Sequence, residues 1–117
     1  MDLNNVVSVA ALAFVGWRVS QMVLGKVSPE TARNLVRDGA LLLDVRTVAE
    51  FAGGHLEGAK NVPVHELAKR IGELGERTRP IVVYCASGVR SASAKATLAR
   101  AGFTAVHDLG AMGRWRG

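Results

Sequence analysis

Residues 81–91 read IVVYCASGVRS, and this stretch explains most about the fold of the chain. Its apolar, β-branched first half predicts a buried strand, which ends at Cys85, the only cysteine in the sequence. A short loop with one glycine and one arginine follows, and the small residues from Ser91 to Arg100 then predict a helix. The stretch therefore predicts a strand–loop–helix unit that carries a thiol where the strand ends.

A loop of this kind, at the N-terminus of a helix, is suited to binding an anion. Successive backbone N–H groups can converge on the anion, and the helix dipole adds partial positive charge. The same field favours the thiolate of Cys85, which is the nucleophilic form of cysteine. Because Gly88 and Arg90 follow at suitable offsets, we interpret Cys85 as a candidate nucleophile, with a buried structural cysteine as the alternative.

Length and composition limit the possible functions. The 117 residues are enough for one domain with its own core, and a single cysteine excludes an intramolecular disulfide and a multi-cysteine metal site. The histidines His55, His65 and His107 lack metal-ligand spacing, so we expect neither a metal nor another cofactor. The net charge is +5, but no lysine and arginine cluster indicates a nucleic-acid partner. This charge fits anionic small molecules or a membrane surface.

The most apolar segment is residues 6–24, VVSVAALAFVGWRVSQMVL, which is about long enough to cross a bilayer as a helix. Arg18 within it and Lys26 beyond it would suit anchoring at the headgroups. Because its apolar residues go nearly all round the helix, we favour a membrane anchor over a helix that packs on protein. We therefore divide the chain into a hydrophobic helix at 1–25 and a catalytic domain at 26–117.

The basic residues that follow the apolar segment predict where the catalytic domain lies. Under the positive-inside rule they place it in the cytoplasm, anchored to the membrane. A soluble cytoplasmic protein is the alternative.

Beyond the apolar segment, helical and extended patterns alternate along the chain. This alternation predicts an α/β fold with a mostly parallel central sheet and helices on both faces. Ligands of such sheets lie beyond the carboxyl ends of the strands, where both Asp44 to Arg46 and Cys85 fall. The expected helices are residues 29–37, 48–51, 64–74 and 91–100, and the expected strands are residues 40–45, 59–62, 81–85 and 104–109.

Several of these segments resemble those of single-domain rhodaneses, the thiosulfate sulfurtransferase-like domains. The resemblance covers roughly residues 26–117 and implies a rhodanese-like α/β fold. The closing segment departs from the family pattern, because Ala111 replaces the second glycine of the usual pair. The matching segments, in order, are DVR at 44–46, EF at 50–51, GHLEGAKNVP at 54–63, CASGVRS at 85–91, GF at 102–103, and Gly110 with Trp115.

The resemblance implies a sulfurtransferase that works through a persulfide on Cys85. Sulfane sulfur would pass from thiosulfate or a similar donor to a thiophilic acceptor such as cyanide, a thiol or a protein cysteine. Cys85 and Arg90 would be catalytic, and Arg90 could either hold the anionic end of the donor or brace the loop. The implied substrate-binding loop consists of Ala86, Ser87, Gly88, Val89, Arg90 and Ser91.

The length of the loop argues against a related chemistry. Four residues separate Cys85 from Arg90, whereas cysteine phosphatases and arsenate reductases use one more and usually place histidine before the cysteine. Here Tyr84 precedes the cysteine. A shorter loop suits a single transferable sulfur atom better than a tetrahedral oxyanion, because a misfitted cradle loses the positioning that catalysis needs.

Other residues of the resemblance have supporting roles. Asp44 and Arg46 are expected to form an ion-pair network at the strand end that supports the active edge, with Glu50 as a plausible partner for Arg46. His55 fits a hydrogen-bonding turn residue better than a proton shuttle. Trp115 could pack near the catalytic loop or simply in the core.

Two other functions stay open at this point. The loop carries little charge, which allows weak activity with thiosulfate and a preference for another donor. The first alternative is therefore a persulfide relay or partner-binding module with little turnover of its own. A catalytically silent structural domain is the second, and the intact Cys85, Gly88 and Arg90 argue against it.

Overall fold

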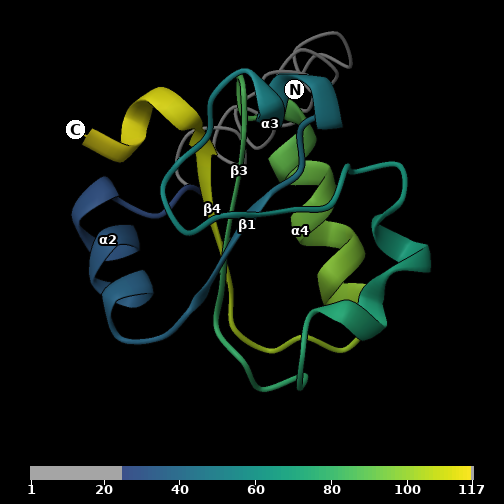
Figure 1. Cartoon of the computed structure of the whole chain (residues 1–117). Coiled ribbons are helices and arrows are strands. Elements are labelled where there is room, and N and C mark those ends of the chain that lie inside the picture. The colour runs from purple at the N-terminus through teal and green to yellow at the C-terminus, as the bar shows by residue number, and fades with distance from the viewer. Residues whose placement is uncertain (1–24, 117) are drawn as a thin grey trace, which may run out of the picture.

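The computed structural model of the chain describes residues 25–116 (Figure 1). The apolar segment at residues 6–24 lies outside the described residues, so its helix and its membrane attachment stay predictions. The same holds for the division into 1–25 and 26–117. Within the described part of the chain, no helix is both long enough and apolar enough to cross a membrane.

A four-stranded sheet forms the centre of the fold, and its strands lie in the order β2-β1-β3-β4. All three neighbouring pairs are parallel, which confirms the predicted parallel sheet. Between the strands the chain passes through helices, as the alternating pattern requires. The strands are β1 at Leu41–Asp44, β2 at Lys60–Asn61, β3 at Ile81–Cys85 and β4 at Val106–Ala111.

Residues 25–116 form three α-helices, of which α2 precedes the first strand, and two of the three begin at caps that the sequence indicates. Ser28 caps α2 by accepting a hydrogen bond from the Thr31 N–H at 3.1 Å. Thr47 and Glu50 form a reciprocal capping box at the start of α3. The helices are α2 at Pro29–Arg37, α3 at Val48–Ala52 and α4 at Val89–Arg100.

The structure differs from the prediction at residues 64–74, where one helix was expected. Two short 3₁₀ helices occur instead, η1 at Leu67–Lys69 and η2 at Ile71–Glu73. A segment this short is marginal as an α-helix, and Gly72 weakens it further. The apolar spacing that suggested a helix still buries Leu67 and Leu74 completely, so tertiary packing and not helix propensity fixes this segment.

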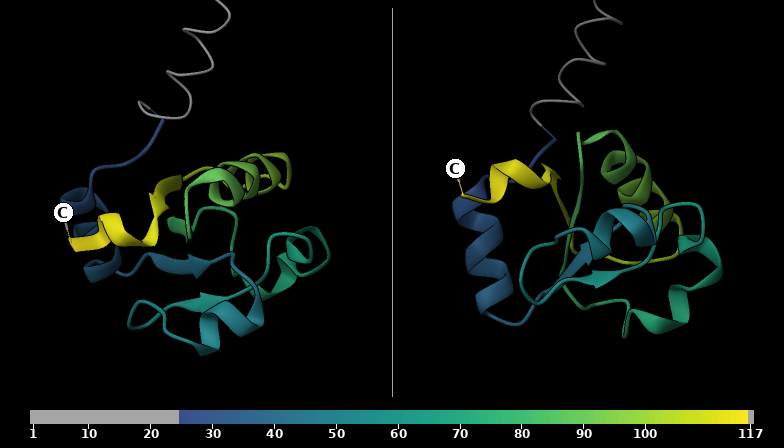
Figure 2. Two further views of the ribbon diagram at one scale, coloured as in Figure 1. Left: turned by 90° about the horizontal axis from the view of Figure 1, so that it is seen from above. Right: turned by 45° about the horizontal axis from the view of Figure 1, so that its top comes forward.

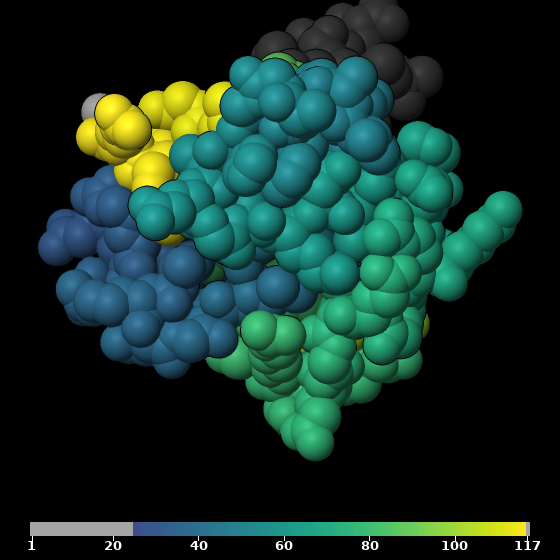
Figure 3. Space-filling model, viewed as in Figure 1, coloured from purple at the N-terminus to yellow at the C-terminus, as the bar shows by residue number. Residues whose placement is uncertain are grey.

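The end of the chain also differs from the prediction. Strand β4 begins and ends two residues later than expected, and a third 3₁₀ helix, η3 at Met112–Arg116, follows directly. The space-filling view shows this C-terminal segment against α2 (Figure 3). There the guanidinium of Arg33 donates a hydrogen bond to the backbone carbonyl of Trp115. This contact orders residues beyond the last expected strand, where the sequence predicted no further element.

Helices cover both faces of the sheet, as Figure 2 shows for α2 and α4. Alternate residues of β3 therefore point into two separate cores. Ile81, Val83 and Cys85 join the core under α4, η1 and η2, while Val82 and Tyr84 join the core under α2 and η3. The Cys85 side chain is thus on the α4 side of the sheet.

The carboxyl ends of β1 and β3 meet at one edge of the sheet, because Asp44 is paired with Tyr84 in register. At the same edge β4 carries a bulge. Val83 pairs with Asp108 and Tyr84 pairs with Gly110, so one residue of β4 is left without a partner in β3. Gly110 has a φ of +88°, a conformation that glycine adopts without strain.

Candidate active site

Cys85 is the last residue of β3, and its sulfur lies within a turn of backbone N–H groups. The N–H of Gly88 is 2.9 Å from Sγ, and the N–H of Ser91 is 3.3 Å from it. The residue has no solvent-exposed surface, whereas Ala86 and Ser87 directly after it are exposed. Backbone N–H groups of the loop thus point at the sulfur, and those of Gly88 and Ser91 lie within hydrogen-bond distance of it.

The conformation of Gly88 makes this arrangement possible. Its φ is +102°, and it caps the N-terminus of α4. A Cβ at this position would lie 3.6 Å from the Cα of Gly110 and be strained by the positive φ. The carbonyl oxygen of Gly88 accepts a hydrogen bond at 3.1 Å from the buried hydroxyl of Ser91. Glycine at this position therefore lets the chain fold back over the sulfur.

These hydrogen bonds change the acidity of the thiol. Burial by itself raises the pKa of the Cys85 thiol, because it disfavours the charged form. Hydrogen bonds from Ser91, Gly88 and Ser87 outweigh burial, so the pKa lies below the ordinary value for cysteine. The site thus favours a thiolate without a histidine or a metal beside the sulfur, as far as the described residues show.

Arg90 is held by an ion pair with Glu50. Its two terminal nitrogens donate to the two carboxylate oxygens of Glu50 at 2.6 and 2.9 Å, and both side chains are about one-third exposed. The hydrogen bond from Arg90 lowers the pKa of Glu50 to about 2, and the N–H of Thr47 contributes to the same shift. This pair joins the first turns of α3 and α4.

The expected pairing of Glu50 with Arg46 is wrong, because the guanidinium of Arg46 folds back onto Asp44. Its Nη2 lies 2.7 Å from Oδ2 of Asp44, and the backbone N–H of Arg46 donates to Oδ1 at 2.8 Å. Both residues are buried, and the hydrogen bonds to Asp44 raise the pKa of the Arg46 guanidinium. Nη2 also donates to the carbonyl of Gly54 at 2.8 Å. The ion pair expected between Asp44 and Arg46 is confirmed.

Sequence comparison agrees with this geometry. Residues 28–116 match the family described as rhodanese-like domain. The chain belongs to this rhodanese family. The geometry fits the assignment, because the cysteine, the glycine and the arginine of the matching loop lie together at one sheet edge.

The alignments of this rhodanese with individual relatives span most of this chain and most of each relative. Thiosulfate sulfurtransferase GlpE from Pseudomonas aeruginosa (strain LESB58) is 36% identical over 92 residues, which are 78% of this chain and 83% of that protein. The Bacillus subtilis (strain 168) protein YqhL is 33% identical over 120 residues, covering 97% of this chain and 94% of that protein.

A solved structure gives the same assignment. The human single-domain sulfurtransferase TSTD1 is 28% identical and superposes with a TM-score of 0.66, covering 78% of this chain and 91% of that one. Together with the likeness to GlpE, this makes the chain a rhodanese-type enzyme.

Two further residues support the active edge of this rhodanese, and sequence reasoning assigned this role to neither of them. The side-chain amide of Asn61 donates to the carbonyls of Asp44 and Arg46, at 3.0 Å each, and so ties β2 to the end of β1. Asn61 is the last residue of β2 and stands in a matching segment, and this position was the available signal. Lys26, expected near lipid headgroups, is instead largely buried against Asp108, so that expectation is wrong.

The remaining predicted residues lie away from the sulfur or at the surface. Nδ1 of His55 is 2.9 Å from the carbonyl of Phe51, and the two rings stack, as expected of a turn residue. Trp115 packs on the core under α2 and η3, which is the second of its two expected positions. Within residues 25–116 no three His, Cys, Asp or Glu side chains form a group able to hold a metal ion.

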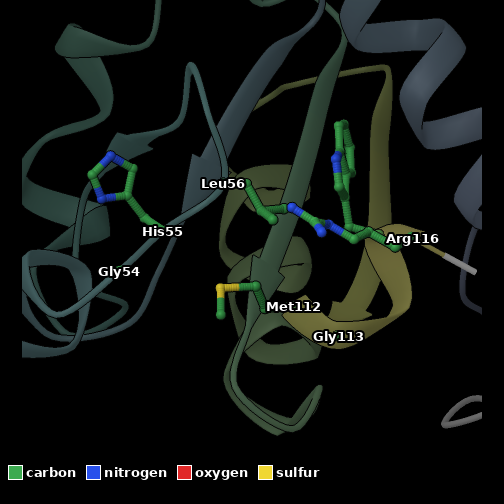
Figure 4. A pocket seen from close by; sticks show the side chains of 7 residues that line it. Gly54, His55, Leu56, Met112, Gly113 and Arg116 are labelled. Atoms are coloured by element: carbon green, nitrogen blue, oxygen red, sulfur yellow. The ribbon is translucent and has the colours of Figure 1, made fainter.

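An open groove of about 330 Å³ lies close to the same sheet edge (Figure 4). Leu56, Met112 and Trp115 in its wall belong to the core on the side of α2, whereas the Cys85 side chain is on the side of α4. No residue of the loop at 86–91 lines the groove, so we do not assign it to the sulfur chemistry. Its lining residues are Gly54, His55, Leu56, Met112, Gly113, Trp115 and Arg116.

Proposed function

We propose that this rhodanese is a sulfurtransferase that carries sulfane sulfur as a persulfide on Cys85. The observation that carries the proposal is the pair of N–H groups, from Gly88 and Ser91, that donate to Sγ and lower its pKa. Donors aimed at a sulfur anion stabilise both the attacking thiolate and the persulfide anion that replaces it. The relative GlpE is a thiosulfate sulfurtransferase, which supports the same reaction.

In the first step the Cys85 thiolate attacks the outer sulfur of thiosulfate or a similar sulfane donor. A bond forms between Sγ and that sulfur while the bond from the outer sulfur to the leaving group breaks. With thiosulfate the electron pair of the broken bond leaves with sulfite, and the outer sulfur keeps its own negative charge as the terminal atom of the persulfide. The lowered pKa of Cys85 raises the fraction of the thiol present as thiolate at a given pH, and the thiolate is the form that attacks.

In the second step a thiophilic acceptor takes the terminal sulfur. Cyanide or a thiolate attacks this atom, the sulfur–sulfur bond breaks, and its electron pair returns to Cys85 as thiolate. The products are thiocyanate or a new persulfide. The same N–H groups that stabilised the persulfide then stabilise the leaving thiolate, so the site serves both steps.

The roles of the other loop residues follow from their contacts. We assign Arg90 to bracing the loop, because both terminal nitrogens of its guanidinium are engaged by Glu50. Substrate contacts then fall to the exposed Ala86, Ser87 and Val89 and to the backbone of the loop. Asp44 and Arg46 support the edge and do not contact the sulfur.

A second candidate function, a persulfide relay that serves a partner protein, is favoured by the surroundings of the loop. Sγ is covered in the folded chain, and the only charged side chain in the loop is already paired. Val48 and Val89, at the first positions of α3 and α4, are 65% and 68% exposed. Apolar residues at this edge suit a protein acceptor better than a small doubly charged anion. A relay would form persulfide stoichiometrically and turn over only when its acceptor protein is added.

Mass spectrometry of the intact protein tests the proposal. After incubation with thiosulfate or an organic polysulfide, the protein should be heavier by one sulfur atom, and cyanide should remove the added mass. Cys85→Ser, which keeps the size of the side chain and removes the nucleophile, should remain unmodified under the same conditions. The absence of the adduct from folded wild-type protein with reduced Cys85, across several donors, would refute the persulfide mechanism.

A further inference from the structure

Lys26 connects the start of the described chain to the loop that follows Cys85. Its ammonium donates to Oδ2 of Asp108 at 2.6 Å and to the carbonyl oxygen of Gly88 at 3.2 Å. The side chain of Lys26 is only 10% exposed and that of Asp108 only 3%. Long lysine side chains rarely occur in the interior without a specific partner, so this position calls for a physical explanation.

The bulge in β4 provides the path for the lysine side chain. Asp108 stabilises the bulge, because its Oδ1 accepts a hydrogen bond from the Gly110 N–H at 2.8 Å. A Cβ at Gly110 would lie 3.4 Å from Cδ of Lys26, which is van der Waals contact, so the lysine side chain runs directly alongside the bulge. The backbone is fixed as well, since the Val27 N–H donates to the carbonyl of Asp108 at 2.8 Å.

At the far end of this path, Lys26 reaches the residue that matters most for the sulfur. Gly88 donates its N–H to Sγ of Cys85, and its carbonyl oxygen accepts from Lys26, from the Ser91 hydroxyl and, at 3.2 Å, from the Ala92 N–H. Gly88 has no side chain, and its φ of +102° is one that few other residues adopt. Hydrogen bonds to its carbonyl are therefore an effective way to hold its peptide groups in place.

We propose that Lys26 is a positioning residue for the sulfur chemistry: by holding the carbonyl of Gly88, it keeps the Gly88 N–H directed at Sγ of Cys85. Asp108 holds the ammonium in place and balances its charge. The effect on turnover rests on the proposed function, but the effect on the thiol does not. Loss of Lys26 therefore makes Cys85 a poorer thiolate, whichever donor or acceptor the enzyme uses.

The competing explanation is that Lys26 and Asp108 form an ordinary structural ion pair. A buried ion pair is weak support for stability by itself, but removing one partner is costly because the other charge is left uncompensated. The two explanations differ in what the double variant Lys26→Met/Asp108→Asn should do. This variant leaves no unpaired charge, yet it still removes the ammonium donor to the Gly88 carbonyl, while the Ser91 and Ala92 donors remain. A structural role predicts recovery of all properties, whereas a positioning role predicts recovery of stability alone.

The experiment measures the rate of Cys85 alkylation by iodoacetamide against pH, together with the melting temperature, on the full chain. In Lys26→Met, Cys85 should be alkylated about threefold to tenfold more slowly at pH values below the thiol pKa. This decrease is the one expected from the loss of one hydrogen bond. Its melting temperature should fall as well. The double variant should regain melting temperature but keep the slow alkylation. Lys26→Arg, which retains a cationic donor, should restore most of the rate.

Two features make the comparison clear. The other charged groups that face this loop and bulge, Arg90, Glu50 and Arg114, are unchanged in all variants. Leu42→Ala, which removes a buried side chain of the core on the α2 side of the sheet, opposite to Cys85, serves as a control for loss of stability alone and should leave the alkylation profile unchanged.

If Cys85 of the double variant were alkylated at the wild-type rate across the whole pH range, the inference would be overturned. If Cys85 of the wild-type protein were alkylated readily but formed no persulfide, the proposed function would be refuted instead. The two failures are therefore distinguishable.

Discussion

The ends of β1 and β3 are neighbours in the sheet, and each buries a side chain that can carry negative charge. At the end of β1, Asp44 accepts from the backbone N–H of Arg46 and from its guanidinium. At the end of β3, Sγ of Cys85 accepts from backbone N–H groups, those of Gly88 and Ser91. The main chain therefore contributes at both ends, but only Asp44 has a cation in direct contact.

This difference separates a structural anion from a reactive one. A carboxylate paired with a buried guanidinium is held by charge as well as by hydrogen bonds, so exchanging this partner for another is unfavourable. A thiolate stabilised by amide N–H groups alone depends on the orientation of those groups, and its electron pair stays available to form a new bond. The Asp44 and Arg46 pair thus holds the edge of the sheet on which Cys85 lies.

The largest effect is expected from breaking the structural anion. Asp44→Asn leaves the buried Arg46 guanidinium without its counter-charge, which should lower the free energy of unfolding by about 3–5 kcal/mol. Urea denaturation followed by circular dichroism measures this loss. Adding Arg46→Met should recover part of it, because no buried charge then remains. A loss below about 1 kcal/mol would show that the pair does not hold this edge.

A smaller effect on stability, but a direct one on the sulfur, is expected at Gly88. Gly88→Ala forces a side chain into a φ of +102° and should cost about 1–3 kcal/mol. Because the Gly88 N–H would move away from Sγ, the pKa of Cys85 should rise towards its ordinary value and alkylation near neutral pH should slow.

Gly53→Ala is the matched control for Gly88→Ala, since Gly53 has a φ of −77° and room for a Cβ. It should leave both stability and thiol reactivity nearly unchanged. Normal alkylation of Gly88→Ala would mean that the amide of Gly88 does not matter to the thiolate.

The smallest effect is expected at the partly exposed pair of Glu50 and Arg90. The pKa of Glu50 is lowered to about 2 from a model-compound value of 4.5, so the pair stabilises the fold fully above pH 4.5. This contribution is lost as the pH falls from 4.5 to about 2, and Glu50→Gln should abolish that part of the acid sensitivity. Thermal melts between pH 2 and 6 measure it.

Glu73 offers a matched control for this prediction, because Arg70 likewise lowers its pKa to about 2. Glu73→Gln should remove a similar acid-dependent contribution without changing alkylation of Cys85. Glu50→Gln should additionally slow alkylation modestly, since the brace on Arg90 is lost. Identical alkylation of both variants would show that Arg90 does not brace the loop.

Much of the fold was predictable because its signals are local. The β-branched run before Cys85, the caps at Ser28 and Thr47, and the alternation of strands and helices all depend on residues a few positions apart. The helix expected at residues 64–74 was wrong for the opposite reason. There the burial of Leu67 and Leu74 against distant strands outweighed a weak local preference.

The sequence by itself determined that a lone thiol ends a buried strand and precedes a glycine-bearing loop at a helix N-terminus. Only the tertiary structure decided which distant side chains hold that loop: Glu50 pairs with Arg90 across 40 positions, and Lys26 reaches Gly88 across 62. The physical reason is that hydrogen bonds along one helix or turn follow from chain spacing. Contacts between helices and strands depend instead on how all the apolar faces pack together.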